Sequence, residues 1–369
     1  MREIIENAVN LTRELIAVPS ESSEPTATTG PCEAGIVEVL KRLCAMNDIT
    51  WQLQEVLPER FNFIASFPKP GAPRIVFLAH MDTVSAQGMR NPFLAEVRDN
   101  KIWGRGACDD KGPLAALFST LIGLHGRGIP LGYDVTLVGS VDEECGMAGS
   151  DRLARDNPNG WDLCVALEPS RLQPISTHIG VYRCRILPQR GSGAESLMAI
   201  KEELGRLKAA INRQSHPALG KAVMTITLIA ADKNRKTGME TDRILVDIRL
   251  LPDHQPAKIH AYIQQVVGDR GRVIPLFAAF GLDSDPHDQF IQAFQASIRA
   301  RNFPDKLIGV PFPSDCSRLK NRGTCLVWGP GDYKAAHKPH EFIEIEQLAG
   351  ACRVLSHFLA RGPGRRILK

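Results

Sequence analysis

The most informative residues in the chain are a histidine and an aspartate that directly follow a short apolar run. His80 and Asp82 come after residues 74–79, whose composition predicts a buried strand. Because strand side chains alternate, these two residues lie on one side of the chain. An imidazole there can bind a metal ion through one nitrogen, while a nearby carboxylate accepts a hydrogen bond from the other and fixes the ring. Alone, the pair fits equally well a strand-end histidine that is satisfied by a nearby acid.

Further ionisable side chains lie where predicted strands end or in the loops that follow; these are Asp109, Glu143, Glu144, Glu168 and His337. Each alone has an ordinary explanation, such as helix capping for Asp109 or solvation for the acidic pair. Together with His80 they supply the nitrogen and oxygen donors that suit zinc or a similar divalent ion. Two neighbouring metal ions need roughly five protein ligands. One acidic side chain is then left to accept the proton of an attacking water.

The elements that must position these residues alternate between strands and helices. Strands are predicted at 74–78, 134–141 and 163–167, and a helix at 114–125 lies between the first two. Each strand is followed by His80 or by acidic residues. This order predicts an α/β fold, with a mainly parallel sheet flanked by helices and the ligands at the carboxyl ends of its strands.

The pattern changes after residue 176. From 177 to 283 the predicted order is β-α-β-β-α-β, which is typical of a ferredoxin-like α+β domain. Residues 284–369 return to the style of the first part. We therefore expect a metal-binding catalytic domain formed by residues 1–176 and 284–369, with residues 177–283 inserted into it.

The composition limits the classes of protein that the chain can represent. Its 369 residues are too many for one ordinary core, which favours two domains. The net charge is +4 and Lys and Arg form no long block, which argues against nucleic-acid and membrane-surface binding. No apolar run could cross a bilayer, and the N-terminus predicts an amphipathic helix rather than a signal peptide. The nine scattered cysteines fit reduced thiols, so a cytoplasmic protein is expected.

Five motifs, taken in order, resemble those of a known enzyme family. They are Leu-Ala-His80-Met-Asp82-Thr-Val, Gly-Arg-Gly-Ala-Cys-Asp109-Asp-Lys-Gly, Asp-Glu143-Glu144, Glu168-Pro-Ser and Gly-Pro-Gly-Asp followed by His337-Lys-Pro-His-Glu341. Their order and spacing are similar to those of the dizinc amidohydrolases that include acetylornithine deacetylase, succinyl-diaminopimelate desuccinylase, aminoacylase and glutamate carboxypeptidase. The resemblance spans almost the whole chain.

The resemblance implies two divalent metal ions, with Zn²⁺ expected and Co²⁺ as the alternative. His80 and Glu168 would bind one ion, and Glu144 and His337 would bind the other. Asp109 would bridge the two, and in this family the peptide bond after that aspartate is often cis.

The same resemblance implies the catalytic roles. Glu143 would be the general acid and base, and Asp82 would be the partner of His80. His340 is a rival to His337 as a ligand, but the spacing of His337 to Glu341 matches the His-x-x-x-Glu ending of the family. Arg318, near Ser314-Asp315, resembles a residue that helps to hold the substrate carboxylate in desuccinylase-like members. Arg249 also matches a family arginine. The alternative for Arg318 is an ordinary surface arginine, and the alternative for Arg249 is an exposed salt bridge on its strand.

The inserted domain departs from the family pattern. In relatives it acts as a lid and often pairs two subunits, which implies a homodimer. Relatives commonly carry a histidine after its first strand, but residues 187–195 contain none. What replaces this histidine near Gly193 stays open, with Arg190, His178 and His216 as candidates. Loss of one oxyanion donor can cost about 3 kcal/mol of transition-state stabilisation.

We therefore predict a zinc-dependent amidohydrolase or metallopeptidase that uses metal-activated water to cleave the amide bond of an N-acyl amino acid, in the manner of acetylornithine deacetylase. A dipeptidase or carboxypeptidase, or a desuccinylase-like enzyme, is the alternative within the class. A catalytically silent protein that binds metal or amino acids is the alternative outside it. The expected partner is a small molecule, either an N-acyl amino acid or a dipeptide.

Overall fold

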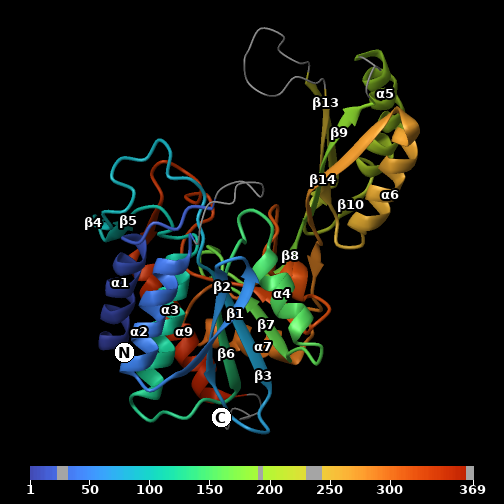
Figure 1. Cartoon of the computed structure of the whole chain (residues 1–369). Helices are drawn as coiled ribbons and strands as arrows, with labels where there is room; N and C mark the ends of the chain where they lie inside the picture. The colour runs from blue at the N-terminus through green and yellow to red at the C-terminus, as the bar shows by residue number, and fades with distance from the viewer. Residues whose placement is uncertain (23–31, 190–193, 230–242, 363–369) are drawn as a thin grey trace. The chain divides into compact units, whose positions relative to one another are not determined.

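A computed structural model describes residues 1–22, 32–189, 194–229 and 243–362, and the chain divides into two units (Figure 1). Unit 1 comprises Met1–Ser176, Ser284–Ile308 and Ser314–Lys369, and unit 2 comprises Thr177–Asp283 and Gly309–Pro313. The sequence pattern predicts residues 309–313 in the metal-binding domain. The structure places them in unit 2, where the backbone N–H of Ile179 donates to the carbonyl of Val310 (3.3 Å).

Unit 1 is built on a mixed sheet with the strand order β1-β2-β6-β3-β7-β17-β8. The strands are β1 (Thr50–Leu57), β2 (Arg60–Phe67), β3 (Arg74–His80), β6 (Asp134–Ser140), β7 (Leu163–Ala166), β8 (Ile175–His178) and β17 (Thr324–Val327). The central strands β6, β3, β7 and β17 run parallel, whereas β1, β2 and β8 run antiparallel to their neighbours. The central strands are almost wholly buried, as strands covered on both faces require. The predicted α/β fold is confirmed.

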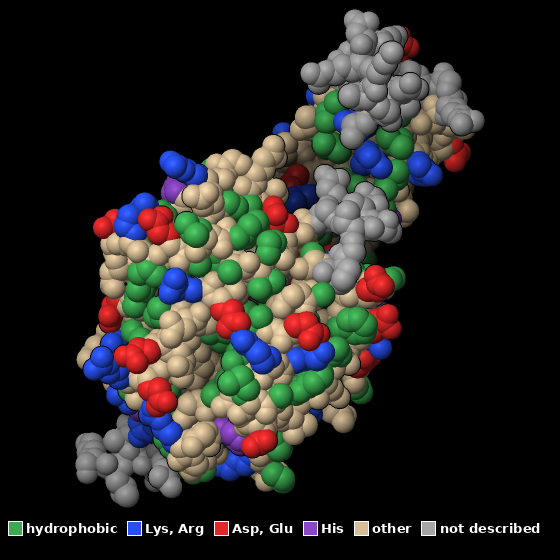
Figure 2. Space-filling view, turned by 60° about the vertical axis from the view of Figure 1, so that its left-hand side comes forward, with side chains coloured by type: hydrophobic (Ala, Val, Ile, Leu, Met, Phe, Trp, Pro, Cys, Tyr) green, Lys and Arg blue, Asp and Glu red, His purple; other side chains and the backbone are tan. Residues whose placement is uncertain are grey.

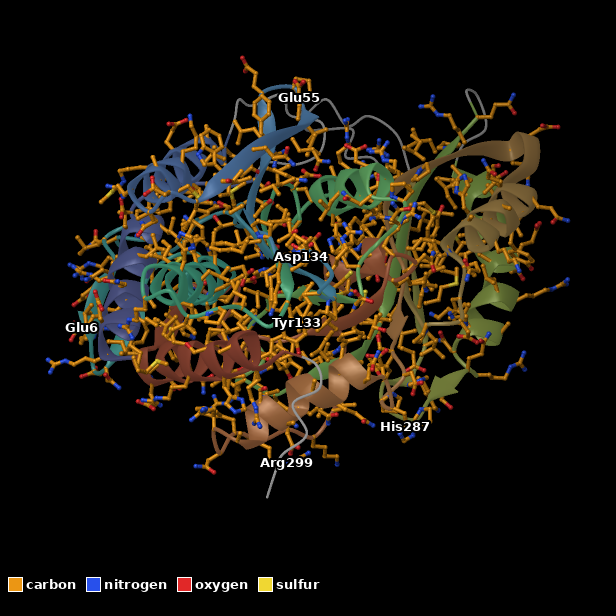
Figure 3. All side chains as sticks on the ribbon, turned by 90° about the horizontal axis from the view of Figure 1, so that it is seen from below. Glu6, Glu55, Tyr133, Asp134, His287 and Arg299 are labelled. Carbon is orange, nitrogen blue, oxygen red and sulfur yellow. The ribbon has the colours of Figure 1, made fainter. Side chains whose placement is uncertain are left out.

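Helices cover this sheet. A single core joins its strands to α1 (Arg2–Ile16), α2 (Ala34–Met46), α3 (Lys111–His125), α7 (Gln289–Arg299) and α9 (Ile345–Arg361). Helix α3 is apolar around most of its circumference, because it is buried against α1, α9 and β3. Tyr133 lies within unit 1, stacked on Phe358 with 4.7 Å between ring centroids, whereas Glu6 and Arg299 lie at the periphery (Figure 3). Two further helices, α4 (Ala148–Asp156) and α8 (Cys316–Leu319), contact each other and the strands β1, β7 and β17.

A small sheet of three strands, in the order β18-β5-β4, adjoins the loop that leads to Asp109. It consists of β4 (Glu96–Arg98), β5 (Lys101–Trp103) and β18 (Phe342–Glu344). The turn residues Asp99 and Asn100 both have positive φ, as a two-residue hairpin of type I′ requires. Just beyond the paired residues of β5 and β18, the Gly104 N–H donates a hydrogen bond to the carbonyl of Glu341 (3.1 Å). Residues 104–110 are thereby tied to the segment that follows His337.

Unit 2 contains an antiparallel sheet in the order β12-β13-β9-β14, with α5 and α6 sharing its core. Its elements are β9 (Gly180–Pro188), α5 (Ala194–Ile211), β12 (Val223–Ile229), β13 (Arg243–Leu250), α6 (Pro256–Val267) and β14 (Gly271–Ala279). Shorter pieces are β10 (Ser215–His216), β11 (Gly220–Lys221), η1 (Gly268–Arg270), β15 (Leu282–Asp283) and β16 (Ile308–Val310). This β-α-β-β-α-β order confirms the predicted ferredoxin-like α+β domain.

Figure 2 shows acidic and basic side chains interspersed over one face of unit 1, in keeping with the small net charge of +4. Among the described helices, none combines the length and the apolar character that crossing a bilayer requires.

Candidate metal centre

The carboxyl ends of β3, β6 and β7 meet at one edge of the sheet of unit 1. In the parallel register His80 lies opposite Ser140, and Leu78 lies opposite Ala166. The loops after β6 and β7 therefore start beside His80, and they carry Glu143, Glu144 and Glu168. Ligands of open α/β sheets are usually bound at such an edge.

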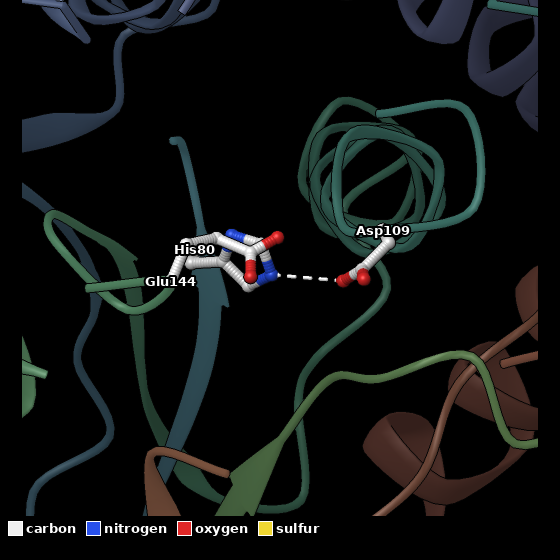
Figure 4. Close-up of side chains that lie close together, drawn as sticks. All are labelled: His80, Asp109 and Glu144. Carbon is white, nitrogen blue, oxygen red and sulfur yellow. Dashed lines mark hydrogen bonds and ion pairs between the residues drawn. The ribbon is translucent and has the colours of Figure 1, made fainter. Parts of the chain in front are cut away.

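Asp109 lies between the two histidines of the site. Its Oδ1 is 3.0 Å from Nε2 of His80, and its Oδ2 is 3.0 Å from Nε2 of His337. The same nitrogen of His337 is 3.0 Å from Oε1 of Glu144. Figure 4 shows His80, Asp109 and Glu144 converging from a strand end, the start of α3 and a loop. A carboxylate with an imidazole at each oxygen can serve two metal ions at once.

All six residues of the predicted donor set are brought together. Potential ligand atoms of His80, Asp109 and Glu144 lie within 4.8 Å of one another, and so do those of His80, Glu143 and Glu168. His337, whose side chain is half exposed, joins them through its contacts to Asp109 and Glu144. The peptide bond between Asp109 and Asp110 is cis, as the family resemblance implied.

The charges of the site are strongly coupled. Burial, together with the neighbouring carboxylates, raises the pKa of Glu143, Glu144 and Glu168 above the usual range. Burial opposes protonation of His80, but its contacts with Asp109 and Asp82 outweigh this and raise its pKa. Hydrogen bonds to Asp109 and Glu144 raise the pKa of His337 to about 11. Clustered carboxylates of this kind are costly unless cations lie among them, so the donor set fits divalent metal ions.

Asp82 differs in detail from the sequence-based expectation. The hydrogen bond of His80 Nδ1 goes to the backbone carbonyl of Asp82 (2.8 Å), and the carboxylate is farther away, at 3.6 Å. The carboxylate instead accepts hydrogen bonds from the backbone N–H groups of Glu143 (3.1 Å) and Glu144 (3.2 Å). Asp82 thus fixes the ring of His80 with its carbonyl and holds the glutamate pair with its side chain.

Glu341 has a supporting role that sequence reasoning did not assign to it. Its Oε1 accepts hydrogen bonds from the backbone N–H groups of Cys108 (3.1 Å) and Asp109 (3.2 Å). Its Oε2 is paired with Arg105 (2.5 Å), and both side chains are buried. The motif ending in Glu341 could have signalled this role, but Arg105 carried no such signal. The pair holds the backbone of Asp109, the residue shared by both histidines.

Replacing Glu341 by alanine should destabilise the chain by about 3–5 kcal/mol, because Arg105 would be left as an unpaired buried charge. Thermal unfolding followed by circular dichroism measures the loss. The matched control is Glu346→Ala, which removes an exposed ion pair with Arg353 and should cost less than about 1 kcal/mol. Equal effects of the two substitutions would contradict a special role for Glu341.

The two arginines predicted to bind substrate occupy different settings. Arg318 donates to the carbonyl of Gly146 (3.3 Å), in the loop that carries Glu143 and Glu144. Arg249, in unit 2, pairs with Asp247 (2.9 Å) on the same strand. For Arg249 the structure therefore shows the ion pair that the sequence analysis gave as the alternative to a substrate contact. Asp315 is buried and accepts hydrogen bonds from Ser140 (2.7 Å) and Ser150 (2.5 Å).

The candidates for the missing histidine of the inserted domain are placed in part. His178 is buried and its Nδ1 lies 2.9 Å from the carbonyl of Ile179. His216 pairs with Asp283 (3.3 Å). Arg190 and Gly193 lie outside the described residues. Their role as substitutes for the missing histidine stays a prediction.

The chain is similar to known proteins over nearly its whole length. Acetylornithine deacetylase from Edwardsiella ictaluri is 26% identical over 384 residues, covering 95% of this chain and 96% of the relative. A metallo-carboxypeptidase of the M20 family from Sulfolobus solfataricus has a similar fold, with a TM-score of 0.74, 16% identity and coverage of 96% and 98%. A dinuclear metal-binding M20 peptidase from Bacillus subtilis gives a TM-score of 0.69 at 16% identity, with 98% of both chains covered.

The model of one protein family matches residues 76–361, which include the whole donor set from His80 to His337 as well as unit 2. Because the match covers most of the chain, the chain belongs to peptidase family M20/M25/M40 and is a hydrolytic enzyme.

Proposed function

We propose that the chain is a dinuclear metal-dependent deacylase that cleaves the amide bond of an N-acyl amino acid. The observation that carries this proposal is the convergence of two imidazoles and four carboxylates, that of Asp109 included, from five separate segments. His80 and Glu168 would hold one ion, Glu144 and His337 the other, and Asp109 both. Zn²⁺ is the expected metal, because it accepts mixed nitrogen and oxygen donors, and Co²⁺ is the alternative.

When bound, the metal ions supply Lewis acidity toward the substrate carbonyl and toward a water molecule. The protein provides the proton transfer. Glu143 takes a proton from the attacking water and passes it to the amine as the carbon–nitrogen bond breaks, which yields a carboxylic acid and a free amino acid.

The acyl amino acid is proposed from the relatives. Acetylornithine deacetylases match the chain over more than nine tenths of both lengths. Arg318, beside the loop 142–147, is proposed to pair with the substrate carboxylate, since a guanidinium binds carboxylates through two parallel hydrogen bonds. Unit 2 is proposed as the lid and as the part that pairs two subunits into a homodimer.

A substrate panel tests the proposal. Protein loaded with Zn²⁺ or Co²⁺ is assayed with N-acetyl-L-ornithine, other N-acetyl amino acids, N-succinyl-diaminopimelate and dipeptides, and kcat/KM is compared. We expect the kcat/KM for an N-acetyl amino acid to exceed that for every dipeptide by at least about tenfold.

Each other outcome has a defined meaning. Preference for dipeptides would show that the enzyme is a dipeptidase rather than a deacetylase. Preference for the succinyl compound would show that it is a desuccinylase. Metal binding without turnover of any amide would show a silent homologue, which the histidine missing from residues 187–195 favours.

A further inference from the structure

The loop 142–147, which carries Glu143 and Glu144, has an unusual start. Asp142 has a φ of 67°, a left-handed conformation that is uncommon outside glycine and that aspartate adopts more readily than most residues. Its carbonyl accepts hydrogen bonds from the N–H groups of Gly146 (2.9 Å) and Met147 (2.6 Å). Its own N–H donates to Oε1 of Glu33 (3.3 Å). Such a conformation persists where the surroundings over-determine it, so the partners of Asp142 set the path of the loop.

Arg60, the first residue of β2, links these partners. It forms two hydrogen bonds with Glu33, from Nε to Oε2 (2.9 Å) and from Nη2 to Oε1. Its Nη1 donates to Oδ1 of Asp142 (3.2 Å). The side chains of Arg60 and Glu33 are 14% and 1% exposed, so the pair is largely shielded from water. One guanidinium therefore spans two carboxylates, and its planar array of donors makes two parallel hydrogen bonds to Glu33 that an ammonium group cannot form.

The same guanidinium is also linked to Asp82, whose carboxylate is a second point at which the loop 142–147 is held. Nη2 of Arg60 lies 3.4 Å from the hydroxyl of Ser22, and that hydroxyl donates to Oδ2 of Asp82 (2.8 Å). The carboxylate of Asp82 in turn holds the N–H groups of Glu143 and Glu144. Arg60 thus contacts Asp142, which precedes the glutamate pair, and it is linked through Ser22 to the carboxylate of Asp82, which holds the pair.

We propose that Arg60 and Glu33 are positioning residues, which fix the loop 142–147 so that Glu144 can ligate metal and Glu143 can face the attacking water. The inference rests on the proposed function, because it needs the metal site. Neither residue belongs to the donor set, and the pair is not explained by stability alone, since buried ion pairs often contribute little net stability. The parallel pair of hydrogen bonds to Glu33, made at the same time as the bond to Asp142, is the feature that favours an arginine.

Two variants separate positioning from stability. In R60K a positive charge still faces Glu33, but the parallel pair of hydrogen bonds and the simultaneous bond to Asp142 are lost. In the double variant E33Q/R60M the charges of Glu33 and Arg60 are removed together, so neither is left unpaired by loss of the other, and Asp142 is the carboxylate that loses its contact with a cation. The matched control is R299Q/D305N, which removes a two-point ion pair on the outer side of α7 (Figure 3).

The readout is Zn²⁺ affinity, measured by competition with a chromophoric chelator at a temperature where circular dichroism shows every variant folded. We expect both R60K and E33Q/R60M to bind Zn²⁺ about 10–100-fold more weakly than the unsubstituted chain, and kcat to fall by a similar factor. R60K should keep its unfolding midpoint, and the control should keep its affinity.

The unsubstituted chain is measured first. If it does not bind Zn²⁺, the proposed function fails, independently of Arg60. If it binds Zn²⁺ and R60K binds equally well, the ion pair serves only the fold and the inference is overturned.

Discussion

Replacing Glu143 by glutamine is expected to lower kcat by about 10²–10⁴-fold, with metal content and thermal stability unchanged. The amide of glutamine can neither accept a proton from water nor donate one to the leaving amine as an acid. Glutamine keeps the shape of the side chain, and the backbone N–H of residue 143 can still donate to Asp82. The measurement is steady-state hydrolysis of the best substrate, together with metal analysis by mass spectrometry.

The adjacent residue provides the control. Glu144→Gln is the same substitution on the same loop, but Glu144 contacts His337 and shares a group of ligand atoms with His80 and Asp109. We expect Glu144→Gln to release metal, whereas Glu143→Gln should retain it. The control is needed because Glu143 also lies within ligand distance of His80 and Glu168. Loss of metal from the Glu143 variant would make Glu143 a ligand and would remove its proposed role as the proton carrier.

The strand ends that carry the site could be predicted from sequence because their signal is local. An apolar run such as residues 75–79 predicts a buried strand, and parallel strands place their carboxyl ends at one edge. His80, Glu144 and Glu168 follow such runs, so their convergence follows from the topology. His337 was a candidate from its place in a loop after a predicted strand, and the family resemblance decided between it and His340.

Helix α4 was not predicted, because its sequence carries little signal. Its nine residues contain two aspartates and two arginines, and only a few of its side chains, such as Leu153 and Ala154, are buried and apolar. So short a helix is held by tertiary contacts, in which Ser150 donates to the buried Asp315. Periodicity in the sequence reports the side of a helix that faces the core, and here that side is too small to be recognised.

The supports of the site were also beyond the sequence, for a different reason. Glu33 and Arg60 lie 27 residues apart, and Arg105 lies 236 residues from Glu341. Charged residues usually lie on solvated surfaces, so composition gives no reason to bury these pairs or to join them. The dual role of Asp82 was missed likewise, because spacing shows that a carboxylate is near His80 but not which of its oxygen atoms takes the hydrogen bond.

Asp109→Ala is expected to remove both metal ions, and this sets it apart from substitution of any other ligand. The two carboxylate oxygens of Asp109 each lie 3.0 Å from a different imidazole, so one side chain serves both halves of the site. Without it, each ion would keep two protein ligands, fewer than a stable site of this kind needs. Activity should fall at least about 10³-fold, since metal ions contribute several kcal/mol to the stabilisation of the transition state.

The contrast with His337→Ala makes this expectation testable. His337 contacts Asp109 and Glu144 but none of the atoms that group with Glu168, so its loss should affect one ion and spare the other. Metal analysis after equilibrium dialysis should find two ions in the unsubstituted chain, about one in His337→Ala and almost none in Asp109→Ala. Retention of one tightly bound ion by Asp109→Ala would show that one metal site is complete without this carboxylate. Asp109 would then be a ligand of a single ion, and the shared-carboxylate geometry on which the dinuclear proposal depends would have to be abandoned.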